Sequence, residues 1–95
     1  MRRLYVLIDK SLKPVYGCVQ GGHAVAQYLL DHPKQVWDNQ YLIYLYADTE
    51  KWSRILEDLG ADYSAFFEPD LDYKMTAIAV EEDSGRLFRN LKTVR

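Results

Sequence analysis

Four hydrogen-bonding side chains, Tyr16, Gln20, His23 and Gln27, follow one flank of a predicted helix over residues 14–30. Their spacing is i, i+4, i+7 and i+11, which places them in one row on a helix of 3.6 residues per turn. An imidazole titrates near neutral pH and an amide can hold a carbonyl group, so the row suits acid–base chemistry on a polar substrate. A packed core helix with a hydrogen-bonded histidine explains the same pattern.

Three carboxylates, Glu68, Asp70 and Asp72, follow a predicted strand over residues 63–67. Ligands of α/β sheets gather beyond the carboxyl ends of parallel strands, where the following helices begin. We therefore expect His23 and Asp70 to face one cleft, with Gln20 on its wall. The alternative is that Asp70 is an ordinary turn residue, because aspartate commonly hydrogen-bonds the backbone of turns.

The order of the predicted elements indicates a single α/β domain over residues 1–95 with a mixed sheet. Strand and helix patterns alternate, which favours right-handed parallel crossovers. The short connection at 68–73 cannot hold a crossover helix, so one strand must run antiparallel to its predecessor. We expect strands at 3–9, 41–47, 63–67 and 74–80, helices at 14–30 and 48–59, a helical turn at 34–39 anchored by Trp37, and a short strand or helix at 86–91. The nearly continuous apolar run at 41–47 predicts a central strand.

The faces of the 14–30 helix predict how it packs. An apolar stripe is expected to face the core, and it consists of Val15, Cys18, Val19, Gly22, Ala26, Leu29 and Leu30. The opposite side carries Gly17, Gly21 and Ala24, with almost no side chain. On this phase Gly22→Leu overpacks the helix–sheet contact by about 1–3 kcal/mol.

Composition limits the class of protein. The chain has 95 residues, a net charge of −2 and one cysteine, Cys18, so it forms no disulfide framework and offers no cysteine pair to a metal. The two histidines, His23 and His32, are too far apart on the helix to share a metal ion. The apolar run at residues 4–8 ends at Asp9, too early for export or a membrane span, so we expect a cytoplasmic protein.

Charge is unevenly distributed along the sequence. Residues 1–13 and 86–95 together carry eight Lys or Arg against the single acid Asp9, while residues 14–85 carry thirteen acids. If both termini converge on one side, the protein has a basic face that can bind nucleic acid phosphates despite its negative total charge. Solvated charged tails explain the same distribution.

Two segments together resemble a known family. The sequence VQGGHA at residues 19–24 is similar to the Q-x-x-H-A helix motif of the type-2 peptidyl-tRNA hydrolases, the archaeal and eukaryotic class. The sequence FEPDLDYKMTA at residues 67–77 resembles that family's second motif, a turn aspartate followed six residues later by a strand threonine. The resemblance spans nearly the whole chain and looks closest to the short bacterial or phage-like members. It implies a mixed four-stranded sheet flanked by helices and hydrolysis of the ester that links a peptide to tRNA, with neither a metal nor another cofactor.

The resemblance also assigns roles to residues. It implies that His23, Asp70, Gln20 and Thr76 are the catalytic residues. The family's lysine, four residues before the glutamine, is replaced here by Tyr16. Candidates for substrate binding are Lys13, Tyr16, Gln27, Arg86 and Arg89. Tyr16 can stack on the terminal adenine of tRNA, and the arginines can contact its phosphates.

Three hypotheses follow from these patterns. The first is a peptidyl-tRNA hydrolase, with peptidyl-tRNA as substrate and partner. The second is a tRNA-binding or regulatory module that keeps the fold with weak or no turnover. The third is a partner-binding domain or homodimer. It would use the face of Gly17, Gly21 and Ala24, or an aromatic patch around Tyr41, Tyr44 and Tyr46.

Overall fold

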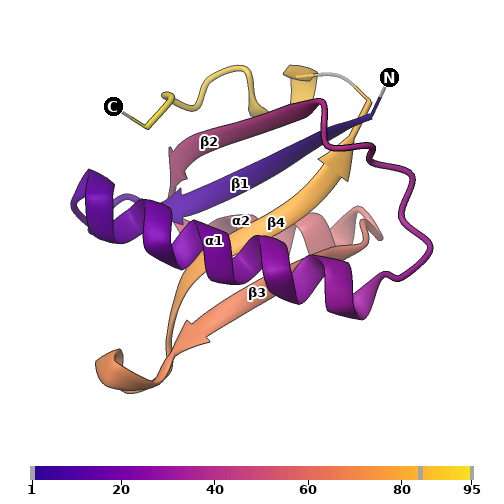
Figure 1. The fold of residues 1–95 in the computed structure, drawn as a ribbon. Coiled ribbons are helices and arrows are strands. Elements are labelled where there is room, and N and C mark those ends of the chain that lie inside the picture. Colours follow the sequence, from indigo (N-terminus) through magenta and orange to yellow (C-terminus); the bar gives the residue numbers. More distant parts are fainter. Residues whose placement is uncertain (1, 84, 95) are drawn as a thin grey trace.

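The protein is a mixed α/β sandwich in the computed structural model, which describes residues 2–83 and 85–94 (Figure 1). The elements are β1 (Arg3–Asp9), α1 (Pro14–Asp31), β2 (Tyr41–Ala47), α2 (Thr49–Asp58), β3 (Tyr63–Glu68), the 3₁₀ turn η1 (Pro69–Leu71), β4 (Lys74–Glu82) and the 3₁₀ turn η2 (Gly85–Phe88). The described strands form one four-stranded sheet in the order β2-β1-β4-β3. The predicted fold class is confirmed.

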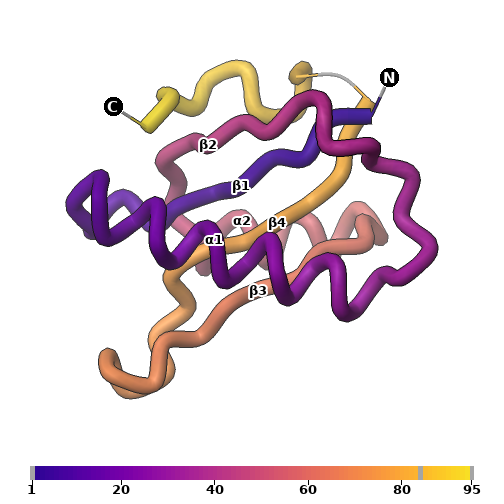
Figure 2. Tube along the Cα trace, viewed as in Figure 1, coloured from indigo at the N-terminus to yellow at the C-terminus, as the bar shows by residue number. Residues whose placement is uncertain are grey.

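The direction of the strands determines where ligands can gather. Strand β1 is parallel to β2 and antiparallel to β4, and β4 is antiparallel to β3. Strands β1, β2 and β3 therefore point the same way, and their carboxyl ends lie at one edge of the sheet together with the first turn of α1 (Figure 2). We call this the carboxyl edge. It is the edge expected for the site from the sequence.

Strand β2 lies at the outer edge of the sheet, so the prediction that it is central was wrong. Its outer side is covered by residues 92–94. The amide of Tyr46 donates to the carbonyl of Lys92 at 2.8 Å, and the amide of Val94 donates to the carbonyl of Tyr44 at 3.0 Å. This short cover satisfies backbone groups that an open edge strand would leave unpaired, which allows an edge strand to have a nearly continuous apolar sequence.

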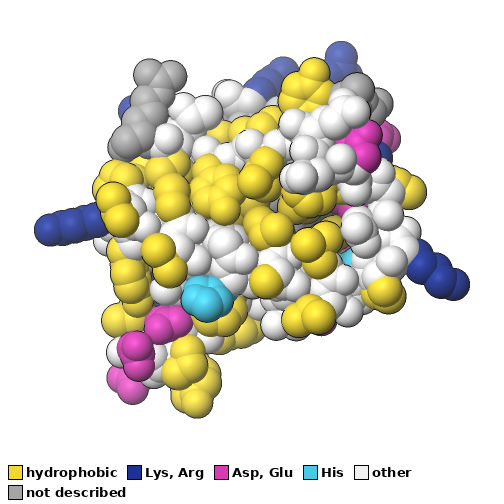
Figure 3. Space-filling view, in the orientation of Figure 1, with side chains coloured by type: hydrophobic (Ala, Val, Ile, Leu, Met, Phe, Trp, Pro, Cys, Tyr) yellow, Lys and Arg dark blue, Asp and Glu magenta, His cyan; other side chains and the backbone are white. Residues whose placement is uncertain are grey.

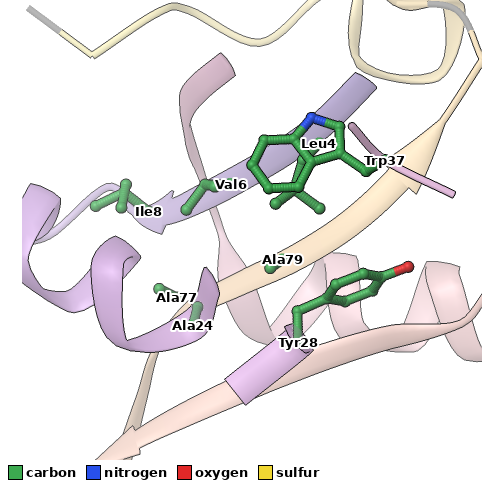
Figure 4. Close-up of a cluster of buried hydrophobic side chains, with 8 residues drawn as sticks. All are labelled: Leu4, Val6, Ile8, Ala24, Tyr28, Trp37, Ala77 and Ala79. Atoms are coloured by element: carbon green, nitrogen blue, oxygen red, sulfur yellow. The ribbon is translucent and has the colours of Figure 1, made fainter. Parts of the chain in front are cut away.

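The core lies on both faces of the sheet. Alternate residues of β1 and β4 point to opposite faces, as the pleat of a strand requires. On the α1 side the buried cluster contains Leu4, Val6, Ile8, Ala24, Tyr28, Trp37, Ala77 and Ala79. Figure 4 shows the small side chains of Ala24, Ala77 and Ala79 between sheet and helix, with the rings of Tyr28 and Trp37 towards one end. On the α2 side the cluster contains Tyr5, Leu7, Leu45, Ala47, Leu56, Ile78, Val80 and Phe88.

Helix α1 packs with the phase opposite to the predicted one. Its buried residues are Gly17, Gln20, Gly21, Ala24 and Tyr28. A Cβ atom on Gly21 would lie 2.7 Å from Ile8 Cδ1, and one on Gly17 would lie 2.5 Å from Ile8 Cγ2. The sheet supplies the bulky side chains, so the helix must contribute its small residues at the contact.

The predicted core stripe of α1 is therefore on the surface. Val15 is 81% exposed and Leu30 is 77% exposed, and a Cβ on Gly22 would meet nothing within 4 Å. The expected overpacking by Gly22→Leu is wrong for the same reason. The Gly17, Gly21 and Ala24 face is buried against the sheet, so it cannot form the partner surface of the third hypothesis.

The remaining elements agree with the sequence in part. Residues 34–39 form no helical turn, but Trp37 is the expected anchor, because it is buried and its Nε1 donates to the Tyr41 carbonyl at 2.8 Å. Asp48 caps α2 by accepting from the Lys51 amide, and Gly60 ends it with φ +68°. Leu59, the residue that follows the last residue of α2, is 60% exposed. No helix in the described residues is long and apolar enough to cross a membrane.

Candidate active site

The two family-like segments are joined by one buried hydrogen bond. The Thr76 hydroxyl on β4 donates to Gln20 Oε1 on α1 at 2.7 Å, and both residues are almost fully buried. Among the described residues, Gln20 Nε2 makes no hydrogen bond to protein. The bond therefore fixes the amide plane and leaves two N–H donors for another carbonyl oxygen.

Thr76 faces α1 because β4 contains a bulge at this point. Phe66 pairs with Ala77 and Phe67 pairs with Met75, so Thr76 is an extra residue between the two pairs. Met75 packs on the α2 side of the sheet, whereas Ala77 packs on the α1 side. A regular strand would put these two residues on the same face. Bulges often redirect a side chain beside a functional site, and this one turns the hydroxyl towards Gln20.

His23 lies one turn after Gln20 and is positioned by an aromatic ring. Its imidazole stacks on Phe66 of β3, with ring centroids 4.5 Å apart and planes 13° apart. The residue is exposed, and in the described part of the chain neither ring nitrogen has a hydrogen-bond partner. The structure thus brings His23 to the same flank as Gln20. It holds the ring by stacking and not by a carboxylate, so both nitrogens are free to act on a ligand.

Asp70 lies in η1, at the end of β3 and close to the first turn of α1. It is exposed, and no hydrogen bond or ion pair joins it to His23 in the described residues. Partial burial raises the pKa of the Tyr16 phenol above 10.0, and the nearby charges of Glu68 and Asp70 raise it further. Tyr16 is therefore a neutral hydroxyl beside two carboxylates, in the place of the family's lysine.

These groups form an open surface rather than a closed pocket. In the space-filling view, acidic side chains gather at the β3–β4 turn and a histidine lies beside them (Figure 3). Donors from Gln20, an imidazole and turn carboxylates can together hold a carbonyl, move a proton and orient a water molecule. These side chains come from α1, η1 and β4.

A buried carboxylate fixes the backbone of the carboxyl edge. Asp9 accepts from the Ser11 amide at 3.2 Å, from the Ser11 hydroxyl, and from the Thr49 amide and hydroxyl at 3.3 and 3.0 Å. Burial alone would raise its pKa, but the hydrogen bonds from Ser11 and Thr49 outweigh this and hold the pKa below 3.8. This cluster joins the ends of β1 and β2 to the start of α2.

Lys74 extends the same cluster and was not identified from the sequence. Its Nζ lies 3.5 Å from Asp9 Oδ2 and donates to Ser11 Oγ at 3.2 Å. The residue opens β4, two residues before Thr76. It therefore places a positive charge between the turn carboxylates and the loop that leads into α1. No spacing in the sequence links Lys74 to Asp9, because their contact depends on strands that are adjacent only in the fold.

The predicted substrate-binding residues lie in three different places. Lys13 is exposed and immediately precedes α1, at the carboxyl edge. Gln27 is half-buried, and its Nε2 donates to Asp31 Oδ1 at 2.8 Å, so it belongs to a local helix contact. Arg86 and Arg89 are exposed and line a cavity of about 640 Å³ near the C-terminus. Of this group, Lys13 and Tyr16 lie at the start of α1, the helix that carries Gln20.

Comparison with known proteins gives the fold and no activity. No family model matches the chain, and no curated protein does so either. Among solved structures, the chain is similar to a protein of unknown function from Agrobacterium tumefaciens strain C58, with a TM-score of 0.71 over 97% of this chain and 96% of the other. The two sequences are 8% identical, so this likeness shows a shared fold alone.

Proposed function

We propose that this protein is a hydrolase of the ester bond between a peptide and tRNA, of the peptidyl-tRNA hydrolase type. One observation carries the proposal. Gln20 and Thr76, one from each segment that resembles a family motif, are 56 positions apart in the sequence, yet they share a 2.7 Å hydrogen bond. Of the remaining family-like residues, Asp70 lies at the carboxyl edge, and His23 lies one turn after Gln20 and stacks on Phe66 of β3.

The side chains supply the parts that ester hydrolysis needs. A water molecule attacks the ester carbonyl, the bond to the ribose oxygen breaks, and that oxygen takes a proton, which gives a free peptide carboxylate and tRNA. The Gln20 N–H donors are suited to hold the carbonyl oxygen as it gains negative charge. Asp70 or His23 is suited to accept the proton of the attacking water, because both side chains are exposed and neither is bonded to another described residue.

Tyr16 fits the nucleic acid end of such a substrate. Its phenol is neutral at pH 7, as an ordinary tyrosine is, and partial burial and the neighbouring carboxylates raise its pKa further. Its ring is about two-fifths exposed at the first turn of α1. A neutral aromatic ring in this position can stack on the unpaired base at the 3′ end of tRNA, an interaction worth about 1–3 kcal/mol.

The test is release of peptide from a defined peptidyl-tRNA. The wild type should release it, and Asp70→Asn should lower turnover by about 10²–10⁴. The matched control is Asp72→Asn, which removes one charge from the same turn. Asp72 has φ +53°, a conformation that asparagine tolerates well, so the control should keep its fold. If the two variants had equal rates, Asp70 would have no specific role in the reaction.

A tRNA-binding module without turnover is the second candidate. The presence of Tyr16 favours this candidate. At this position the family that the sequence resembles has a lysine, whereas here the site has an aromatic ring that can stack on a base and lacks that cation. The module would bind tRNA and protect the ester. Binding of peptidyl-tRNA with no peptide released, in wild type and in Tyr16→Lys, would decide for this candidate.

A further inference from the structure

A basin with three lysines lies at the carboxyl edge, on the α2 side of the sheet. It has a volume of about 420 Å³, and its lining includes Lys10, Lys51, Lys92, Tyr46, Trp52 and Asp48. We call it the lysine basin. The lysines come from three separate segments: the end of β1, the first turn of α2 and the residues that cover β2. Lys51 is remote in the sequence from the basic termini, so the sequence alone does not indicate that it lies beside Lys10 and Lys92.

The backbone holds these lysines rigidly while their ammonium groups stay free. The Lys10 amide donates to the Ala47 carbonyl at 2.8 Å, and the Lys92 carbonyl accepts from the Tyr46 amide at 2.8 Å. None of the three side chains takes part in an ion pair among the described residues. Asp48, the acid of the basin, already accepts from the Lys51 amide as the α2 cap. The basin thus has a net charge of +2 in a chain whose net charge is −2.

The cationic surface extends beyond the basin. Asn90 lines both the lysine basin and the neighbouring cavity that holds Arg86 and Arg89. The half-buried side chain of Trp52 lies among these cations, whereas the side chain of Tyr46 packs against the cluster on the α1 side of the sheet. Lysines beside an aromatic ring are typical of a surface that binds a nucleic acid strand, because cations bind phosphates and a ring can stack on an unpaired base.

The acidic residues near the candidate active site favour a separate phosphate-binding surface in the lysine basin. Glu68, Asp70 and Asp72 repel phosphates from the turn over which the ester must lie. A tRNA can therefore present its 3′ end to Gln20 only if its phosphates are held elsewhere at the same edge. Lys10 directly follows β1 and lies four residues before the first residue of α1, so one short loop joins the basin to the start of α1.

We propose that the lysine basin binds the phosphates of an RNA strand and anchors tRNA beside the candidate active site. The inference rests on the proposed function in taking tRNA as the ligand. The RNA backbone then lies on the α2 side, and the 3′ end passes over the carboxyl edge towards Tyr16 and Gln20. Arg86 and Arg89 continue the same track.

The first test is the salt dependence of tRNA binding, measured by fluorescence anisotropy. The double variant Lys51→Gln, Lys92→Gln should make the slope of log K against log salt shallower by roughly 1.4–1.8, since each phosphate contact contributes about 0.7–0.9. The matched control is Lys34→Gln with Arg54→Gln, which removes the same charge from positions outside the basin and should leave the slope within about 0.3 of wild type. Equal slopes for both double variants would overturn the proposal.

The second test uses the two indoles as reporters. Titration with a single-stranded RNA that ends in CCA should shift the Nε1–H resonance of Trp52, assigned with Trp52→Phe. The resonance of Trp37 should not move, because its Nε1 donates to Tyr41 in the core. AMP and inorganic phosphate serve as further probes. Saturation of the Trp52 shift by AMP at concentrations where RNA has no effect would mean a nucleotide pocket, and the RNA proposal would fail.

The two proposals can fail separately. If tRNA binds through the basin and no peptide is released, the hydrolase proposal fails and the anchor remains. If peptide is released, but Lys51→Gln with Lys92→Gln changes neither KM nor the salt slope, the anchor fails and the hydrolase proposal remains.

Discussion

Two adjacent glycines of α1 should respond oppositely to the same substitution. In Gly21→Ala, the new Cβ would lie 2.6 Å from Tyr44 Cε2, 2.7 Å from Ile8 Cδ1 and 2.9 Å from Val6 Cγ1. Carbon atoms in contact prefer about 3.5–4.0 Å, so side chains from β1 and β2 must move. Overpacking of this kind costs about 1–3 kcal/mol. In Gly22→Ala, the Cβ enters open space.

Comparing the two variants isolates the packing cost. Both substitutions gain about 0.5–1 kcal/mol from replacing a mid-helix glycine by alanine, and this gain cancels in the difference. The free energy of unfolding of Gly22→Ala should therefore exceed that of Gly21→Ala by about 1–3 kcal/mol. Gly22→Ala should also be at least as stable as wild type.

Urea and thermal denaturation of wild type and both variants provide the assay. For a domain of this size, 1 kcal/mol corresponds to about 4–8 °C in Tm, so the two variants should differ by several degrees. Equal Tm values, or a lower Tm for Gly22→Ala, would mean that α1 packs with the opposite phase. The exposed Val15 stripe would then be the core face after all.

Three further predictions concern the site and the edge that carries it. Thr76→Val removes the hydroxyl bonded to Gln20 and leaves a buried amide oxygen unpaired, so urea denaturation should show a loss of about 1–3 kcal/mol, whereas Thr76→Ser should restore most of it. Tyr16→Lys should raise the rate of peptide release, and an unchanged rate in a single-turnover assay would mean that the tyrosine does not limit the reaction. Asp9 has a lowered pKa in the folded state, so its stabilising effect is complete above the unfolded pKa and is lost as the pH falls through the folded one. Asp9→Asn should therefore be less stable at pH 7, and its stability should fall less than that of wild type when the pH is lowered below about 4.

Local sequence patterns predicted the elements and the edge at which the candidate site lies. Apolar runs of strand length, the proline at the start of α1 and the Asp48 cap each follow from short-range chemistry. The short 68–73 connection also required an antiparallel pair. The convergence of β1, β3 and the start of α1 at one edge then followed from strand direction alone.

The phase of α1 could not be predicted in this way, because hydrophobicity was taken as the sign of burial. The sheet presents Val6, Ile8 and Tyr44 to the helix, and the space between them admits only residues such as Gly21. Burial here is decided by volume, which requires knowledge of the partner surface. The exposed side of α1 carries the larger apolar residues, and for this reason the sequence pattern assigned the wrong face of the helix to the core.

The contacts that position the candidate site residues were not predicted, because they join strands that are distant in the sequence. Phe66 supports His23 only because β3 lies beneath α1, and Thr76 turns towards Gln20 only because of a bulge whose register involves both β3 and β4. Lys51 joins Lys10 and Lys92 through the pairing of β2 with the C-terminal residues. A single sequence contains no signal of these distances.

The proposed reaction is tested by incubating the protein with a defined peptidyl-tRNA in water enriched in heavy oxygen, followed by mass spectrometry of both products. We expect one heavy oxygen atom in the peptide carboxylate and an intact tRNA with a free 3′ end, because in the proposed reaction water attacks the carbonyl. We also expect Gln20→Ala, which loses the donors proposed to hold that carbonyl, to slow the release strongly. An intact substrate after incubation with wild-type protein, or a cleaved RNA chain with the ester still in place, would show that the protein does not hydrolyse the peptidyl ester.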